Sequence, residues 1–348
     1  MRIPLKPLRE QTIVITGASS GIGLATARAA AGQGARVVLA ARNDEALAEA
    51  VREINGTAGR EVAVHVPADV SDKDDMERVA STAVERFGGF DTWVNNAGVS
   101  VYGRLEEVSD EDSQRLFQTN FWGVVHGSLI AVRHLKLRGG ALINVGSVAS
   151  DAPIPLQGMY SASKHAVKGF TDALRMELQA DSAPVSVTLI KPGAIDTPYL
   201  EHAKNYMGHQ PKHAPPVYPP REVAEAILYA AAHPRRDIYV GSSARAVSAM
   251  SRMVPQATDR VLASVMPGQQ QRDDPPRDPE GALHRAGRGG RERGDHPGYV
   301  MRRSYYMWSS IHPAITAAVL ATVGIAAVTL ARRSPGRPRA RRVIGRAR

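Results

Sequence analysis

Tyr160 and Lys164 lie four residues apart, and this spacing places both side chains on one face of a helix. A free phenol has a pKa of about 10, and a fixed cation beside it favours the phenolate. We therefore expect Lys164 to lower the pKa of Tyr160 toward the range in which a phenol exchanges protons at neutral pH. Ser147 ends a strand-like run thirteen residues before Tyr160, where α/β sheets expose functional side chains. Taken alone, the Tyr–Lys pair also fits a solvated helix surface.

A glycine-rich turn follows the first expected strand. The β-branched run at residues 12–16 leads directly into this turn, and a helical pattern continues from Leu24 to Gln33. Between a strand and a helix, such a turn lets a pyrophosphate approach the backbone and the helix N-terminus. The sequence therefore predicts a dinucleotide site built on Gly17, Ser19, Ser20, Gly21, Ile22 and Gly23.

Six motifs occur in an order that resembles the short-chain dehydrogenase/reductase family. They are TGASSGIG at 16–23, NNAG at 95–98, Asn120, Ser147, YSASK at 160–164, and Pro192 with Gly193. The resemblance covers residues 10 to about 242. It implies an α/β fold of the Rossmann type, a doubly wound parallel sheet of about seven strands with helices on both faces.

The resemblance also implies roles for single residues. Tyr160 would exchange a proton with the substrate, Ser147 would hydrogen-bond the substrate oxygen, and Lys164 would bind the nicotinamide ribose. Asn120 would hold a water that links Lys164 to solvent, although alone it also fits a polar helix surface. Asp69 would lie beside the adenine, or merely cap the helix after it. The remaining cofactor contacts implied are Val70, Asn96, Ala97, Gly98, Pro192, Gly193, Ile195 and Thr197.

The end of the second strand indicates the cofactor preference. Relatives that prefer NAD place an acid there for the ribose 2′-hydroxyl, whereas this chain has Ala40, Ala41 and Arg42. A cation suits a 2′-phosphate, so the sequence favours NADP(H) over NAD(H). The alternative is that Arg42 is a solvated charge at a helix start.

Periodicity places the other elements. Strands are expected at 12–16, 36–41, 61–66, 91–94, 141–145, 185–190 and 237–240, and helices at 22–33, 44–54, 72–87, 110–137, 158–179 and 221–232. Apolar stripes on the helices at 110–137 and 158–179 fit either a dimer seam or a monomer core, so a homo-oligomer, dimer or tetramer, rests on family analogy. The irregular segment 199–219 is expected to be a substrate lid. Its histidines, without cysteines or paired acids nearby, do not favour a metal site.

Composition and charge divide the chain. Cysteine is absent, which excludes disulfides and thiolate nucleophiles. Residues 1–266 carry no net charge, and the net charge of +10 belongs to residues 267–348. We expect a catalytic domain at 1–266 in the cytoplasm, because no apolar run precedes the first strand. Residues 267–300, rich in Gly, Pro and charge, are expected to be a disordered linker.

The last segment, 301–348, is the part of the chain that we expect to contact a membrane. Tyr305, Tyr306 and Trp308 precede nineteen uncharged residues at 313–331, and an Arg-rich end follows. A helix of that length, at about 1.5 Å per residue, just spans a bilayer core. A single crossing would place the terminal arginines outside, whereas Arg and Lys usually stay on the cytoplasmic side. Three interpretations therefore stay open: a spanning helix, a helix that dips into the membrane, or a tail without membrane contact that binds an acidic partner such as nucleic acid. Nucleic acid is not favoured, and we expect membrane association through residues 305–331.

The sequence thus predicts an NADP(H)-dependent oxidoreductase that interconverts a carbonyl and an alcohol, on a lipophilic small molecule. Two other classes remain: a module that binds NADPH and senses redox state without turnover, and a scaffold that acts through its basic tail.

Overall fold

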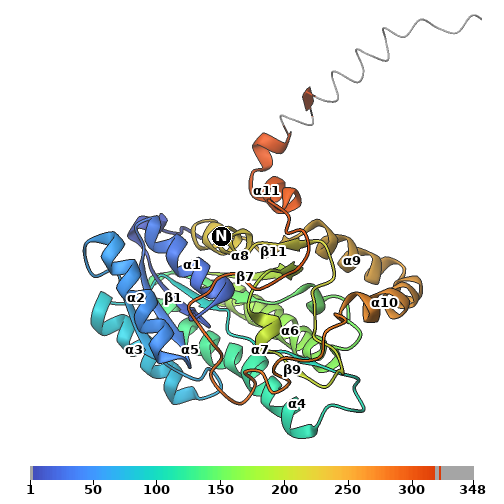
Figure 1. Cartoon of the computed structure of the whole chain (residues 1–348). Helices are drawn as coiled ribbons and strands as arrows, with labels where there is room; N and C mark the ends of the chain where they lie inside the picture. The colour runs from blue at the N-terminus through green and yellow to red at the C-terminus, as the bar shows by residue number, and fades with distance from the viewer. Residues whose placement is uncertain (1–2, 318–320, 323–348) are drawn as a thin grey trace, which may run out of the picture. The chain divides into compact units, whose positions relative to one another are not determined.

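A parallel sheet of seven strands forms the centre of the computed structural model, which describes residues 3–317 and 321–322 (Figure 1). The strand order is β11-β7-β6-β4-β1-β2-β3. The strands are β1 (Thr12–Thr16), β2 (Arg36–Ala41), β3 (Ala63–Pro67), β4 (Thr92–Asn95), β6 (Gly140–Val145), β7 (Val185–Pro192) and β11 (Asp237–Val240). The strand order reverses direction between β1 and β4, so the predicted doubly wound sheet is confirmed.

Helices cover both faces of this sheet. On one face lie α1 (Gly21–Gly32), α2 (Asp44–Ala58) and α8 (Pro220–Ala232), and on the other lie α3 (Lys73–Phe87), α5 (Gly123–Arg138) and α6 (Gly158–Ala180). The strands are therefore buried on both sides, as their unbroken apolar runs require. Side chains cap several helices: Asn43 accepts from the Ala46 amide, and Asp72 from the amides of Asp74 and Asp75.

The helix expected at 110–137 is interrupted. It consists of α4 (Asp110–Phe117), a π-helical turn at Gln118–Trp122, and α5. The wide turn contains Asn120, whose side chain is buried and hydrogen-bonded to the backbone of Val99. Periodicity could not show this break, because one extra residue in a turn hardly disturbs an apolar stripe.

The segment 199–219 is partly regular. It contains α7 (Tyr199–His202), β9 (Lys204–Asn205) and β10 (Val217–Tyr218). The strand β9 pairs with β5 (Val101–Tyr102), and β10 pairs with β8 (Ala194–Ile195). After β11 come two further helices, α9 (Ser242–Met253) and α10 (Pro255–Gln269).

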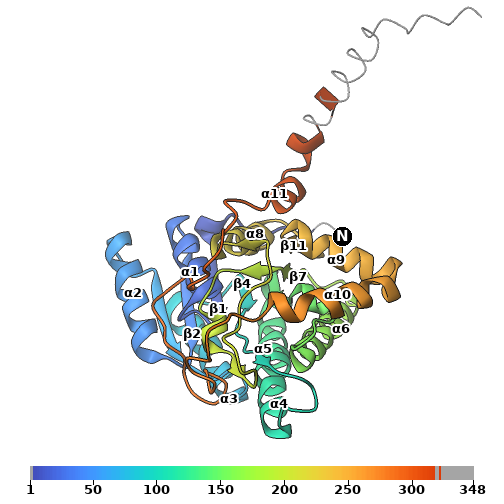
Figure 2. The same ribbon diagram turned by 45° about the vertical axis from the view of Figure 1, so that its right-hand side comes forward.

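The linker predicted at 267–300 is not disordered in the structure. Its first three residues end α10, and residues 270–304 follow a defined path over the sheet domain (Figure 2). Leu283 is fully buried among Val99, Val101 and Leu116. The segment has few apolar groups, and main-chain hydrogen bonds and ion pairs such as Arg272–Asp295 hold it instead. By compactness, Met1–Met307 forms one unit and Trp308–Arg348 a second.

The helix α11 (Tyr305–Ile311) begins the last segment. Residues 313–317 are helical, while 318–320 and 323–331 of the predicted membrane helix lie outside the described residues. Within 3–317 and 321–322, no helix combines the length and the apolar composition that a membrane crossing needs.

Candidate active site

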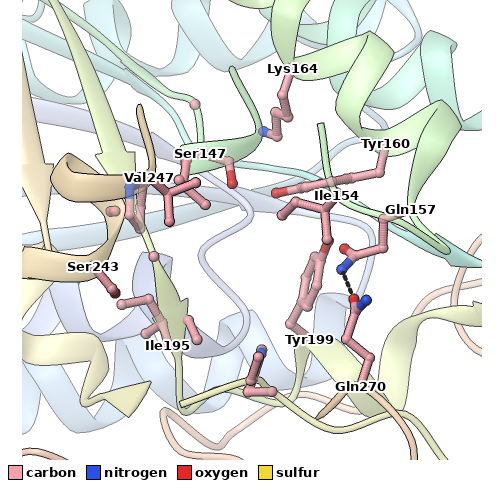
Figure 3. A pocket seen from close by; sticks show the side chains of 18 of the residues that line it. Ser147, Ile154, Gln157, Tyr160, Lys164, Ile195, Tyr199, Ser243, Val247 and Gln270 are labelled. Atoms are coloured by element: carbon pink, nitrogen blue, oxygen red, sulfur yellow. Dashed lines mark hydrogen bonds between the residues drawn. The ribbon is translucent and has the colours of Figure 1, made fainter. Parts of the chain in front are cut away.

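Ser147, Tyr160 and Lys164 come together where β6 ends and α6 begins, beside a cavity of about 250 Å³. Figure 3 shows the Ser147 and Tyr160 hydroxyls pointing toward one another. The Lys164 Nζ atom lies 5.7 Å from the centroid of the Tyr160 ring and donates to the Val145 carbonyl oxygen at 2.9 Å. The two side chains therefore share one site, as their spacing predicts.

The electrostatics of this pair differ from the prediction. Burial raises the pKa of Tyr160, and the neighbouring hydroxyls of Ser147 and Tyr199 only partly oppose this rise. Burial also lowers the pKa of Lys164 to about 8. We expected Lys164 to lower the pKa of Tyr160. In the cofactor-free protein this expectation is wrong, because burial of the phenol raises its pKa above the ordinary value. At neutral pH Tyr160 thus keeps a proton that it can give.

Ser147 is held by its own turn. Its Oγ atom accepts from the Ala149 amide at 3.1 Å, and its amide donates to the Ser150 Oγ atom at 3.2 Å. This reciprocal pair caps the short 3-10 turn Val148–Ser150. The turn therefore fixes the direction in which the Ser147 hydroxyl faces the cavity.

Asn120 does not line either cavity described here. Its Oδ1 atom accepts from the Val99 amide at 2.8 Å, and its Nδ2 atom donates to the Val99 carbonyl oxygen at 2.9 Å and to the Ser163 Oγ atom at 3.2 Å. These contacts tie the π turn to the segment after β4 and to α6. Asn120 thus positions Ser163, the residue before Lys164, relative to the segment after β4.

A second cavity, of about 170 Å³, adjoins the first along the glycine-rich turn. At Gly17, with φ +65°, an added Cβ would lie 2.7 Å from the Ala97 Cα atom, and at Gly23 it would lie 2.2 Å from the Gly17 oxygen. Asn96 braces the turn by donating to the Thr16 and Gly17 carbonyl oxygens. Only glycines allow this close backbone packing, which suits a dinucleotide phosphate.

The predicted cofactor residues divide between the two cavities. Ser147, Tyr160, Lys164, Pro192, Gly193 and Ile195 line the first; Gly17, Ser19, Ser20, Gly21, Arg42, Asp69, Val70 and Ala97 line the second; and Ile22, Asn96, Gly98 and Thr197 line both. Gly23 packs behind the turn. The fold therefore brings nearly all of these residues to two adjoining cavities.

Asp69 and Arg42 already have partners at the rim of the second cavity. Asp69 forms an ion pair with Arg115 at 2.5 Å and accepts from the amide and hydroxyl of Ser71. Burial opposes ionisation of Asp69, but these bonds outweigh it and lower its pKa. Arg42 donates to the carbonyl oxygens of Ala282 at 2.6 Å and Leu283 at 3.2 Å. These last two residues belong to the segment predicted to be disordered.

Sequence patterns missed several residues of the first cavity. Tyr199 lies edge-on to Tyr160, with ring centroids 5.9 Å apart. Leu262 and Met266 of α10 and the following Gln270 also line the cavity, and the Gln157 Nε2 atom donates to the Gln270 Oε1 atom at 2.5 Å. The apolar residues of α10 around Leu262 indicate that one face of this helix packs against the protein. The sequence did not indicate that this face would line the first cavity.

Comparison with known proteins agrees with this geometry. The family described as short chain dehydrogenase matches residues 11–207, more than half of the chain. The chain belongs to the short-chain dehydrogenase family, and it is therefore a dehydrogenase/reductase of CH–OH and C=O groups.

Two relatives and two solved structures define the likeness further. An uncharacterized oxidoreductase, YxnA of Bacillus subtilis (strain 168), is 50% identical over 337 residues, which cover 95% of this chain and 93% of the relative. The 11-beta-hydroxysteroid dehydrogenase A of Sesamum indicum is 38% identical over 188 residues, 54% of this chain and 53% of its own.

Both solved structures carry a dinucleotide. An alcohol dehydrogenase of the archaeon Thermococcus sibiricus, complexed with 5-hydroxy-NADP, is 29% identical with a TM-score of 0.58, and covers 66% of this chain and 95% of its own. An L-sorbose reductase of Gluconobacter frateurii, complexed with NADPH and L-sorbose, is 27% identical with a TM-score of 0.58. The match covers 69% of this chain and 97% of the reductase. About a third of this chain has no counterpart in either structure.

Proposed function

We propose that this chain uses NADP(H) to interconvert a carbonyl and an alcohol on a lipophilic small molecule, with Tyr160 as the acid and base. The observation that carries the proposal is the pair of facing hydroxyls of Ser147 and Tyr160 beside the buried Lys164 ammonium, next to a glycine-walled cavity. The close packing at Gly17 and Gly23 fits a dinucleotide phosphate, which would lie on that turn and the N-terminus of α1.

The chemistry follows from the residues. A bound nicotinamide dinucleotide supplies or accepts the hydride at the substrate carbon. Ser147 donates a hydrogen bond to the substrate oxygen as negative charge develops on it. Tyr160 gives its proton to that oxygen in reduction and takes it back in oxidation, so that hydride and proton together convert C=O to CH–OH. Lys164, whose Nζ atom lies 5.7 Å from the centroid of the Tyr160 ring, provides a nearby cation that favours the phenolate left after proton transfer.

The walls of the first cavity support a lipophilic substrate. Ile154, Val247, Leu262 and Met266 contribute apolar surface. His213 also lines this cavity, and within the described part of the chain its buried Nε2 atom has no hydrogen-bond partner. A lipophilic carbonyl compound with a second polar group away from the reacting carbon would satisfy both features.

Two observations support NADP(H) as the cofactor. The end of β2 has Ala40, Ala41 and then Arg42 instead of a carboxylate, and Arg42 lines the second cavity. The two solved structures are complexes with 5-hydroxy-NADP and with NADPH. A homo-oligomer is also proposed, because Trp122 at the end of the π turn, Leu129 on α5 and Met176 on α6 leave apolar surface exposed.

A panel of aliphatic, aromatic and polycyclic carbonyl compounds, assayed by oxidation of NADPH and of NADH, tests the activity. We expect turnover with at least one lipophilic compound and a faster rate with NADPH. Tyr160→Phe should reduce turnover by about 10²-fold or more, because it removes the proton donor, and should leave the NADPH dissociation constant nearly unchanged. Equal turnover in the variant and the wild type would show that Tyr160 is not the acid.

A further inference from the structure

Residues 281–292, here named the strap, cross the rim of the second cavity. Arg42 holds the carbonyl oxygens of Ala282 and Leu283, and Asn43 donates to the Gly287 oxygen at 2.9 Å. Ala282 and Gly287 themselves line the cavity. The strap is therefore a wall of the predicted cofactor site, and its contacts begin at the residue that indicated the cofactor preference.

The strap also pairs with the backbone of the glycine-rich turn. The Gly290 amide donates to the Ser19 carbonyl oxygen at 2.9 Å, and the Gly21 amide donates to the Arg291 carbonyl oxygen at 2.9 Å. Arg28 and Glu292 form an ion pair at 2.8 Å just beyond this point. The strap thus closes over the turn from the Arg42 side to the first residues of α1.

Two features show that the strap is built to lie there. The side chain of Leu283 is fully buried in the cluster that contains Val99, Val101 and Leu116. At Gly289 an added Cβ would lie 2.2 Å from the Ala46 Cβ atom and 3.0 Å from the Ser19 oxygen, so the strap passes α2 where only glycine fits. An apolar anchor and a steric requirement for glycine support the same closed position.

We propose that the strap is a cover of the cofactor's adenosine end, which must open for a dinucleotide to bind or leave and which, when closed, retains it. The inference rests on the proposed dinucleotide site. Arg42 has five N–H donors, and its two bonds to the strap leave others free for a phosphate. Arg42 therefore both holds the strap and faces the cofactor, so closure and binding reinforce one another.

Two loosening variants test the cover in the full chain. Leu283→Ser removes the apolar anchor, and Gly289→Ala forces the strap from α2. Leu137→Ser and Gly56→Ala are matched controls, because Leu137 is 87% exposed and a Cβ at Gly56 meets nothing within 4 Å. The rate of NADPH dissociation, followed by its fluorescence after mixing with excess NADP⁺, should rise tenfold or more in both loosening variants and stay unchanged in both controls.

A cross-link tests the same cover in the opposite direction. The chain has no cysteine, so Arg28→Cys with Glu292→Cys gives one specific pair, which a short bismaleimide with a reducible spacer can join. Cross-linking before NADPH is added should slow binding tenfold or more, and cross-linking afterwards should trap the bound NADPH. Reduction of the spacer should restore exchange in both cases. Each single-cysteine variant, treated with the reagent, is the control.

The outcomes separate the cover from the proposed function. If the wild type binds neither NADPH nor NADH, both proposals fail. If it binds and the loosening variants exchange NADPH at the wild-type rate, the cover is rejected while the dinucleotide site stands. Tighter NADPH binding in the loosening variants would also reject retention, because it would show that the strap competes with the cofactor.

Discussion

Lys164 is an ammonium group placed almost completely out of water. Its Nζ atom donates to the Val145 carbonyl oxygen, and burial lowers its pKa from 10.5 to about 8. A pKa that is lower in the folded than in the unfolded chain means that the charged form costs folding stability. The cost is fully present below about pH 8 and disappears as the pH rises toward 10.5.

Lys164→Met makes this cost measurable. At pH 7 the variant should unfold with a free energy higher by up to about 3 kcal/mol, less the loss of the Val145 hydrogen bond. The difference between variant and wild type should shrink as the pH rises from about 8 to 10, because the wild type then becomes neutral at this position. Urea unfolding of the cofactor-free proteins across this range gives the two curves. A constant difference would contradict a depressed Lys164 pKa.

Arg42→Ala tests the cofactor preference. Loss of a charge-assisted contact to a 2′-phosphate should weaken NADPH binding by roughly 1.5 to 3 kcal/mol. NADH binding should weaken less, because only the hold of Arg42 on Ala282 and Leu283 is lost there. Titration of both nucleotides against both proteins provides the comparison. Equal losses for NADH and NADPH would leave Arg42 as a support of the strap alone.

At the scale of single residues, the sequence predicts which side chains come together better than it predicts their pKa values. The spacing of Tyr160 and Lys164 correctly predicted that the two side chains share one site, and Gly17 and Gly23 correctly indicated a tight turn, because helical spacing and close backbone packing depend on local residues. The direction of the Tyr160 pKa shift could not be predicted, since it depends on how many distant residues bury the phenol. Tyr199 and Gln270 were missed for the same reason.

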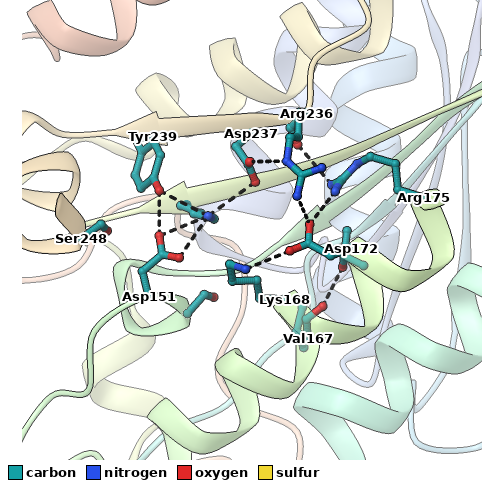
Figure 4. A network of polar contacts seen from close by, with 12 residues as sticks. Asp151, Val167, Lys168, Asp172, Arg175, Arg236, Asp237, Tyr239 and Ser248 are labelled. Atoms are coloured by element: carbon teal, nitrogen blue, oxygen red, sulfur yellow. Dashed lines mark hydrogen bonds and ion pairs between the residues drawn. The ribbon is translucent and has the colours of Figure 1, made fainter. Parts of the chain in front are cut away.

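Among the elements, the turn after Ser147 is tied to the sheet by a buried polar cluster around Asp151, and Figure 4 shows its contact with Tyr239. Asp151, just after the turn that orients Ser147, accepts from Lys191 of β7, Tyr239 of β11 and Arg252 of α9. Both Asp151 and Lys191 have at most 1% of their side-chain surface exposed. The network therefore links the Ser147 turn to the helix that carries Val247 to the substrate cavity.

Asp151→Ala should destabilise the protein by the lower end of about 3 to 5 kcal/mol, because the buried Lys191 ammonium loses its nearer carboxylate and keeps only Asp237, at 3.5 Å. The double variant Asp151→Ala with Lys191→Met should recover much of this loss, since no uncompensated charge remains. Chemical unfolding of the two variants and the wild type measures both effects. A double variant as unstable as the single one would show that packing around Asp151, rather than its charge, matters.

The sheet elements were largely predictable, because continuous β-branched runs indicate strands buried on both faces. The break of the helix at Gln118–Trp122 was not, because a π turn is stabilised by the tertiary contacts of Asn120 with Val99 and Ser163. The short strands within 199–219 could not be predicted either, because each is only two residues long and depends on pairing with a distant strand of the same length.

At the scale of the whole molecule, the tail contains two different parts. Residues 270–304 belong to the catalytic unit, although their composition is that of a linker. Composition rules count side chains that can be buried, whereas the strap is held largely by its own carbonyl and amide groups, which every residue carries. No sequence pattern could therefore show that these residues cover the second cavity.

Membrane association through residues 305–331 remains a prediction, motivated by the aromatic cluster and the uncharged run at 313–331. The full chain should sediment with membranes, resist molar salt and be released by detergent, because salt screens ionic attachment but does not extract an apolar helix. A variant that ends at Met307, the limit of the compact unit, should stay in the supernatant. Release by salt alone would favour ionic attachment, and a full chain that never sediments would rule out the membrane.

The position of the strap late in the chain bears on how the protein is made. All seven strands of the sheet are complete at Val240, and the strap begins about forty residues later. Ribosomes add about 5 to 20 residues per second, so the open site would precede its cover by several seconds during synthesis. A nascent chain that folds as it emerges would offer the nucleotide an uncovered site first, and the newly made enzyme could be loaded before its strap arrives.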